Sequence, residues 1–137
     1  MKTAVLDASA LLALFFDEPS AEKVENLFHQ AAEADKSLLI SAVNWAEVLY
    51  KMERKHGVQG LAGAKRFERT MPLDIAPIDL ALAESAAHLK TAHGLGLADS
   101  FAAALAKSKK AELLTADLEF KPLEKEIKIN WLTATSR

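Results

Sequence analysis

Short apolar runs alternate along the chain with longer segments in which apolar residues recur every three or four positions. A short apolar run, partly β-branched, predicts a strand buried on both faces, and the longer spacing predicts an amphipathic helix. The predicted strands cover residues 2–6, 38–40, 73–77, 112–115 and 127–132. The predicted helices cover residues 10–16, 21–34, 42–55, 58–70, 80–93 and 98–109.

Polar residues and glycines mark the ends of these helices. Four residues stand directly before a helical pattern, where a side-chain oxygen can accept a hydrogen bond from a free N–H group of the first turn: Ser9, Ser20, Ser41 and Asp79. Gly57 and Gly94 each follow a histidine at the end of a pattern, as is typical of a helix C-terminus. We therefore expect six separate helices, with a break at Gly57.

Strands that alternate with helices imply parallel βαβ units. We expect an α/β fold, a three-layer α/β/α sandwich with a mainly parallel five-stranded sheet. The 137 residues are enough to bury a core, and the sequence contains no internal repeat, low-complexity tract or linker. The expectation is a single domain over residues 1–137.

Composition narrows the class of protein. Apolar residues make up 50% and charged residues 26%, which is typical of a soluble globular protein. The absence of cysteine excludes disulfides, zinc–thiolate sites and thiol nucleophiles, and suits a reducing cytoplasm, where we expect the protein to lie. We see no signal peptide, because Asp7 interrupts the apolar stretch after Lys2, and no run that could span a membrane. The net charge of −2 excludes indiscriminate binding of nucleic acid.

Four acidic residues lie where predicted strands end or helices begin. Asp7 follows the first strand, and Asp117 comes two residues after the fourth. Glu47 and Asp99 lie in the first turn or two of predicted helices. In an open α/β sheet these positions converge on one crevice at the carboxyl ends of the strands. Carboxylates gathered there would repel one another without cations between them, so the pattern predicts Mg²⁺ or Mn²⁺ and phosphate chemistry.

Each acid taken singly has a simpler structural explanation. Asp7 can cap a helix, although Ser9 stands nearer to the predicted helix start. An isolated helical glutamate such as Glu47 is usually on the surface. Asp99 suits the dipole of a helix N-terminus, and Asp117 is typical of a turn. Four acids with unrelated structural roles have no reason to lie at the same edge of one sheet, so together they favour a catalytic role.

The chemistry that this set suggests is hydrolysis of a phosphodiester bond. Metal ions held by the carboxylates would lower the pKa of a bound water molecule and neutralise charge on the phosphate. Glu47 is the candidate that orients or deprotonates the water, and Thr115 can bond a metal-bound water or Asp117. The sequence contains no GxSxG, Walker A or GxGxxG motif, and its histidines lack the spacing of metal ligands.

Basic residues form two clusters in the sequence. The first is Lys51, Arg54, Lys55, Lys65, Arg66 and Arg69, and the second is Lys107, Lys109 and Lys110. Solvated helix faces are the commoner explanation for both. Because the first cluster follows Glu47 on the same helix, it could also hold the backbone of a nucleic acid that leads away from the acids.

Four segments in this order resemble the motifs of PIN domains, across nearly the whole chain. They are residues 5–13 (VLDASALLA), 41–48 (SAVNWAEV), 97–104 (LADSFAAA) and 114–120 (LTADLEF). A lone domain of this length is most similar to the VapC-type toxins of toxin–antitoxin pairs. The resemblance implies a Mg²⁺- or Mn²⁺-dependent endoribonuclease that acts on RNA, is usually a homodimer, and is inhibited by a small antitoxin protein that covers the acidic site.

The resemblance also ranks the acids. It implies that Asp7 and Asp99 bind the metal directly, that Asp117 is the next ligand, and that Glu47 acts directly or through water. Two other classes remain open. A haloacid-dehalogenase-like phosphatase would need an acid where Ser9 stands, and a receiver domain would need an adjacent acidic pair after its first strand. A non-catalytic binding module that keeps the PIN fold is the other alternative.

Overall fold

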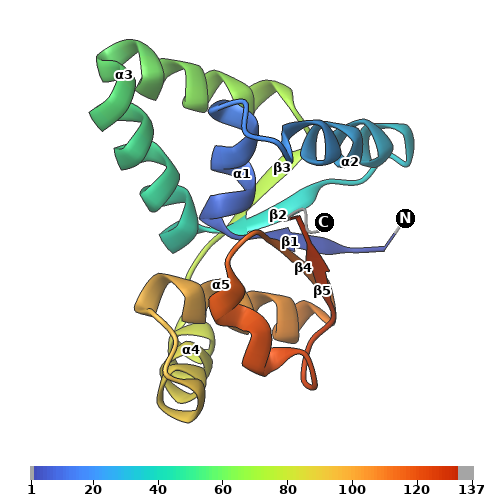
Figure 1. The fold of residues 1–137 in the computed structure, drawn as a ribbon, viewed down its shortest axis with the longest axis vertical. Helices are drawn as coiled ribbons and strands as arrows, with labels where there is room; N and C mark the ends of the chain where they lie inside the picture. The colour runs from blue at the N-terminus through green and yellow to red at the C-terminus, as the bar shows by residue number, and fades with distance from the viewer. Residues whose placement is uncertain (1, 133–137) are drawn as a thin grey trace.

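A five-stranded sheet forms the middle layer of the molecule. The computed structural model describes residues 2–132 of the 137-residue chain. In these residues the strands are β1 (Ala4–Leu6), β2 (Leu38–Ser41), β3 (Leu73–Ala76), β4 (Glu112–Thr115) and β5 (Ile129–Trp131). Their order across the sheet is β3-β2-β1-β4-β5, and every pair is parallel (Figure 1). The predicted α/β sandwich is confirmed, with a sheet that is wholly parallel.

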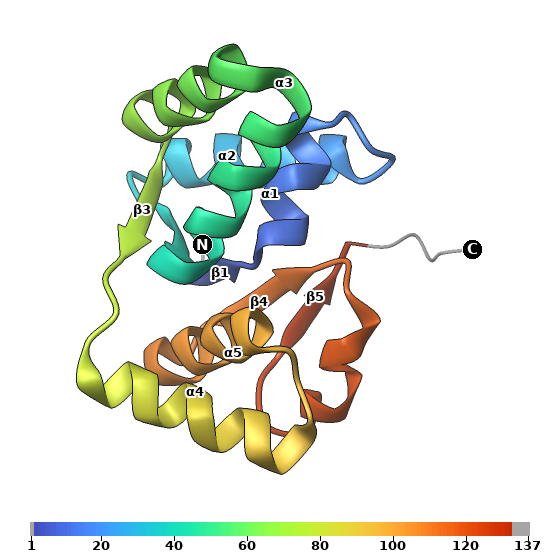
Figure 2. The same ribbon diagram turned by 90° about the vertical axis from the view of Figure 1, so that its left-hand side faces the viewer.

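Helices cover both faces of this sheet. On one face lie α1 (Ala8–Phe15), α2 (Ala21–Glu33) and α3 (Ala42–Thr70), and on the other lie α4 (Leu80–His93) and α5 (Leu97–Lys109) (Figures 1 and 2). A 3₁₀ helix, η1 (Leu118–Leu123), follows β4. No helix within residues 2–132 combines the length and the apolar character needed to cross a membrane.

Alternate residues of the central strands fill two separate cores. Leu6, Ile40 and Leu114 pack on the side of α1, α2 and α3, whereas Val5 and Leu113 pack on the side of α4 and α5. All five side chains are fully buried. A strand buried on both faces needs apolar residues at every position, which is why these strands appear in the sequence as continuous apolar runs.

The order of the strands creates a switch point between β1 and β4. From β1 the chain steps outward to β2 and β3, and it then returns through α4 and α5 to place β4 on the other side of β1. Leu6 pairs with Leu114 at the end of the two strands. Loops that leave adjacent strands in opposite directions leave a crevice beyond their carboxyl ends, where ligands of open α/β sheets bind.

Helix caps agree with the sequence at two of the four predicted positions. The side chains of Ser41 and Asp79 accept hydrogen bonds from the first turns of α3 and α4. Ser20 occupies the cap position of α2, but its side chain makes no cap hydrogen bond. The prediction for Ser9 is wrong: α1 begins at Ala8 and Asp7 is its cap. Asp7 ends β1 in an extended conformation, so its side chain reaches the Ala10 N–H, and the helix starts two residues earlier than predicted.

The predicted break at Gly57 is confirmed. The segments 42–55 and 58–70 are two helical stretches of α3 joined by a kink at Gly57, where φ is +67° and ψ is −155°. Glycine adopts this left-handed backbone without a steric penalty, so the chain turns there and continues as helix. The 3₁₀ helix η1 was not predicted, and β5 is shorter than the predicted strand at 127–132.

Candidate active site

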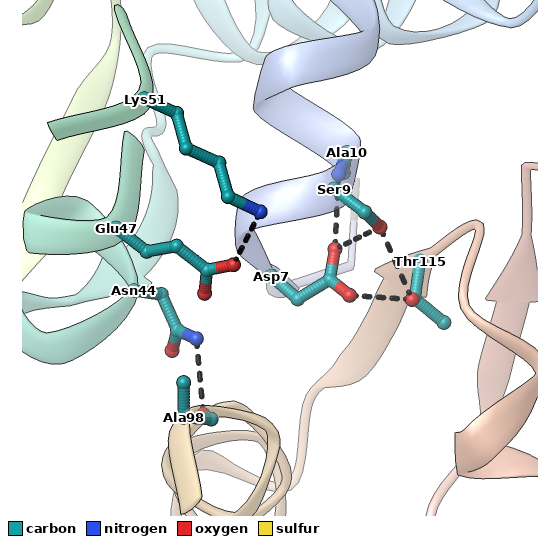
Figure 3. A network of polar contacts seen from close by, with 8 residues as sticks. All are labelled: Asp7, Ser9, Ala10, Asn44, Glu47, Lys51, Ala98 and Thr115. Atoms are coloured by element: carbon teal, nitrogen blue, oxygen red, sulfur yellow. Dashed lines mark hydrogen bonds and ion pairs between the residues drawn. The ribbon is translucent and has the colours of Figure 1, made fainter. Parts of the chain in front are cut away.

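Asp7 lies at the switch point, held by donors from two elements. Its carboxylate is almost fully buried, with 2% of the residue exposed. One oxygen, Oδ1, accepts hydrogen bonds from Ser9 Oγ at 2.8 Å and from Ala10 N at 2.9 Å. The other, Oδ2, accepts from Thr115 Oγ1 at 2.5 Å (Figure 3). The carboxylate therefore has a fixed orientation between α1 and the end of β4.

The hydroxyls of Ser9 and Thr115 also hold the loop after β4. Thr115 Oγ1 accepts a hydrogen bond from the backbone N–H of Asp117 at 2.9 Å, and Ser9 Oγ accepts from that of Ala116 at 3.2 Å. The Thr115 hydroxyl thus contacts the Asp7 carboxylate, the Asp117 backbone and, at 3.5 Å, Ser9 Oγ. Together the two hydroxyls link the acid after β1 to the acid after β4.

Burial dominates the electrostatics of Asp7. Loss of water raises the pKa of its carboxyl to about 6 from an ordinary value of 3.8. The hydrogen bonds from Thr115, Ser9 and Ala10 act in the opposite direction, and the negative charge of Asp117 adds to the rise. A buried carboxylate that is costly to ionise gains from a nearby cation.

Three further acids gather beside this residue. Asp99 lies in the first turn of α5, Asp117 is the cap of η1, and Glu119 lies within η1. Each offers a carboxylate oxygen, and these oxygens all lie within 4.8 Å of one another. The structure thus brings together Asp99 and Asp117, as expected, and adds Glu119. A signal for Glu119 was present in the sequence, because it stands two residues after Asp117 in the same turn.

Asp99 is the acid that its neighbours affect most. Partial burial raises the pKa of its carboxyl to about 7, and the negative charges of Asp117, Asp7 and Glu119 contribute to the rise in that order. The influence of Asp7 places Asp99 within electrostatic range of the buried carboxylate at the end of β1. The four acids therefore lie close enough together to interact electrostatically at the edge of the sheet where the strands end.

The donor chemistry of this centre fits a hard divalent cation. Carboxylate oxygens are the ligands that Mg²⁺ and Mn²⁺ prefer, and the four acids supply them without nitrogen or sulfur. Burial raises the pKa of both Asp7 and Asp99, and neighbouring carboxylates add to the rise, so a cation at the centre would favour their ionised forms. The carboxylate oxygens of Asp99, Asp117 and Glu119 are therefore close enough together to hold such an ion, and Asp7 lies within electrostatic range of them.

Glu47 approaches the centre from α3 and stands apart from the three-acid cluster. Its carboxylate is half-buried and accepts a hydrogen bond from Lys51 Nζ, one helical turn further on, at 2.9 Å. The pKa of Lys51 is raised by this bond, so its ammonium stays charged. Figure 3 shows the Glu47 side chain extending from α3 toward the side on which Asp7 lies. The Glu47 carboxylate is therefore already paired with the ammonium group of Lys51.

Apart from Lys51, which pairs with Glu47, the residues of the two basic clusters with contacts in the structure lie at the opposite edge of the sheet or against aromatic rings. Lys107 and Lys110 line a cavity of about 850 Å³ at the amino ends of β1 and β4, the opposite edge of the sheet. In the first cluster, Arg54 lies over the ring of Tyr50 at 5.4 Å, and Lys55 lies over that of Phe16 at 4.5 Å. These contacts agree with charged side chains that cover helix faces.

Comparison with known sequences finds similar proteins over most of the chain. A family model described as the PIN domain matches residues 4–126. The ribonuclease VapC30 of Mycobacterium tuberculosis and the VapC ribonuclease Mb0640 of Mycobacterium bovis are each 31% identical over 123 residues, which cover 85% of this chain and 91% of theirs.

Solved structures share the fold at lower identity. DNA-bound VapBC from Salmonella typhimurium is similar with a TM-score of 0.76 at 18% identity, over 97% of this chain and all of that one. A toxin–antitoxin complex from Klebsiella pneumoniae is similar with a TM-score of 0.70 at 24% identity, over 96% of this chain and 98% of that one. These likenesses concern the arrangement of helices and strands.

Proposed function

The chain belongs to the PIN-domain family, and on that premise we propose that it is a metal-dependent endoribonuclease, the toxin of a toxin–antitoxin pair. The observation that carries the proposal is the convergence of Asp7, Asp99, Asp117 and Glu119 at the switch point of the sheet. Relatives of the same length that are named ribonucleases support RNA as the substrate.

The acids divide the work according to their surroundings. Asp7, Asp99 and Asp117 would hold the ion, with Glu119 beside them. When bound, a divalent cation supplies positive charge to the phosphodiester and lowers the pKa of water. Thr115 and Ser9 keep the Asp7 carboxylate in one orientation through their hydroxyl hydrogen bonds. An acid that must keep one geometry through each turnover benefits from such fixed donors.

Glu47 acts on the water in this proposal. It reaches the centre from a helix, and its partner Lys51 holds one of its oxygens at 2.9 Å. The other oxygen can accept the proton of the attacking water, which is the task of a general base within hydrogen-bond reach. The water oxygen then forms a bond to phosphorus, and the bond between phosphorus and the leaving ribose oxygen breaks. That ribose oxygen takes up a proton.

An antitoxin partner fits the surface around the acids. Leu97 lies two residues before Asp99 and Leu118 directly follows Asp117, and these leucines are 59% and 66% exposed. Large apolar side chains beside a charged site are typical of a surface that a protein partner covers. We therefore propose a small antitoxin that contacts these leucines and covers the acids. A homodimer is part of the same proposal.

RNA cleavage by the purified protein tests the enzymatic part. With Mn²⁺ the wild type should cut RNA, whereas Asp7→Asn and Asp99→Asn should lose activity by at least about 100-fold, because each removes a charged ligand from the centre. The matched control is Asp74→Asn, which makes the same chemical change at an exposed position of β3 and should retain wild-type cleavage.

Equal cleavage by the wild type and both site variants would reject the assignment, since the activity would then come from a contaminant or another site. Absence of cleavage by a wild type that still binds Mn²⁺ and RNA would favour the non-catalytic binding module. Mapping the ends of the cut RNA identifies the cleavage sequence when activity is present.

A further inference from the structure

A buried amide connects the two helices that bring Glu47 and Asp99 to the site. Asn44 lies in the first turn of α3 and is 1% exposed. Its Oδ1 accepts a hydrogen bond from Ser41 Oγ at 2.5 Å. Its Nδ2 donates to the backbone carbonyl of Ala98, in the first turn of α5, at 3.0 Å, and Figure 3 shows this second bond. The second bond joins residues 54 positions apart in the chain.

The two ends of this connection lie beside acids of the centre. Ala98 directly precedes Asp99, so the bonded carbonyl belongs to the peptide group that leads into the acid. Glu47 lies three residues after Asn44, nearly one turn along α3. Residues three apart in a helix lie on neighbouring positions of its surface. One side-chain amide therefore links the start of α5 to the turn of α3 that carries Glu47.

The chemistry of the amide determines its orientation. Ala98 offers a carbonyl oxygen, which can only accept, so the NH₂ group must face α5 and the oxygen must face α3. The hydroxyl of Ser41 completes the arrangement, because it donates to that oxygen while it accepts from the backbone N–H of Asn44 at 3.0 Å. An aliphatic residue of the same size would fill the space but would leave the two helices without this link.

Stability of α3 does not require the amide. The cap of the helix uses the Ser41 side chain and the backbone N–H of Asn44, and both would remain if the side chain changed. Ala98 could likewise keep the backbone hydrogen bond of its own helix. The Asn44 side chain therefore serves the placement of α5 relative to α3.

We propose that Asn44 is a positioning residue of the metal centre, one that holds Asp99 in register with Glu47 through the Ala98 carbonyl. The inference rests on the proposed function, since it assigns the amide to the same site. Groups that orient a metal ligand from outside typically change metal affinity or activity by about 10- to 100-fold when they are removed.

Three measurements on Asn44→Leu test the proposal. In metal-free protein, hydrogen exchange followed by mass spectrometry should be faster in the first turn of α5 than in the wild type, whereas α4 should be unchanged. Calorimetric titration with Mn²⁺ should show affinity weakened by about 10-fold. A fall in kcat with little change in KM for RNA should accompany these effects, because the substrate surface is intact.

Asp79→Ala is the matched control for a general loss of stability. It removes the cap bond to Leu82 N in α4, far along the chain from the acids, and should leave Mn²⁺ affinity at the wild-type value. If Asn44→Leu does not fold, Asn44→Ser replaces it, because its side chain is shorter by one bond and loses the link to Ala98. The same exchange and affinity changes are expected.

The outcomes separate this inference from the proposed function. A wild type that neither binds Mn²⁺ nor cleaves RNA would overturn the function itself. A wild type that does both, together with an Asn44 variant that has unchanged exchange in α5 and unchanged Mn²⁺ affinity, would overturn the positioning role alone. Equal weakening of Mn²⁺ binding in Asp79→Ala would also overturn it, since the effect would then follow stability.

Discussion

The end of β1 and the start of α5 present the same side chain in contrasting surroundings. Asp7, at the end of β1, is buried and receives three hydrogen bonds from Ser9, Ala10 and Thr115. Asp99, at the start of α5, is half-buried and faces other carboxylates. The pKa of Asp7 is raised to about 6, because loss of water on burial outweighs the opposing effect of its hydrogen-bond donors. The pKa of Asp99 is raised to about 7, because loss of water and repulsion by neighbouring carboxylates act in the same direction.

This difference separates two ways of preparing a metal ligand. Asp7 has a structural task as the cap of α1, and its donors keep it in place whether or not an ion is bound. Asp99 depends on the charge of its neighbours and gains most when a cation separates them. We therefore expect the Asp7 region to control the geometry of the centre, and the Asp99 region to control its response to metal.

The largest expected effect is a pH dependence that arises at Asp7. Because its folded pKa is raised above 3.8 to about 6, its contribution to stability is complete below pH 3.8 and is lost as the pH rises through about 6. Between about pH 4 and pH 7.5, the metal-free wild type should lose on the order of 3 kcal/mol of unfolding free energy relative to Asp7→Asn.

Urea denaturation of both proteins in the presence of a chelator, across this pH range, measures the difference. Asp74→Asn, at an exposed position, should follow the wild type at every pH. If the difference in unfolding free energy between wild type and Asp7→Asn does not change with pH, burial does not raise the pKa of the Asp7 carboxyl.

The second prediction removes a donor from the Asp7 region. Thr115→Val keeps the shape of the buried side chain but leaves Asp7 Oδ2 without its hydroxyl partner and the Asp117 N–H without its acceptor. An orphaned buried polar group costs about 1–3 kcal/mol of unfolding free energy. Thermal and urea denaturation should detect this loss.

Thr91→Val is the matched control, because Thr91 is exposed and its hydroxyl donates to a helix carbonyl, that of Ala87. It should change the unfolding free energy by no more than about 0.5 kcal/mol. Equal effects of the two substitutions would contradict a special role for the Thr115 hydroxyl.

The smallest effect is expected at Asp99, and it is opposite in sign to that of Thr115→Val. Asp99→Asn removes one of the repelling carboxylates, so the metal-free protein should gain about 1 kcal/mol of unfolding free energy at pH 8, a value reduced by the partial exposure of the group. Mg²⁺ should raise the melting temperature of the wild type by binding the folded state, and should raise that of Asp99→Asn much less.

Scanning calorimetry with and without Mg²⁺ measures both parts of this prediction. Asp74→Asn should respond to Mg²⁺ as the wild type does. An undiminished response of Asp99→Asn would remove Asp99 from the set of ligands and would transfer that role to Asp117 and Glu119.

Much of the fold could be predicted from local sequence because each element has its own signal. Buried parallel strands produce continuous apolar runs, so the strand at 112–115 was predicted with its observed bounds. The caps Ser41 and Asp79 follow from side chains that bond N–H groups three residues away. Positions after strands and at helix starts likewise marked Asp7, Glu47, Asp99 and Asp117 before their distances were known.

Other features depend on residues that meet only in the folded chain. The spacing of residues cannot reveal that Thr115 donates to Asp7, that Glu119 joins Asp99, or that Asn44 bonds Ala98, because each pair is far apart along the chain. Sequence patterns report which face of an element is apolar, a local property. The strand order around β1 decides which polar side chains share one crevice, and that order follows from packing both faces of the sheet at once.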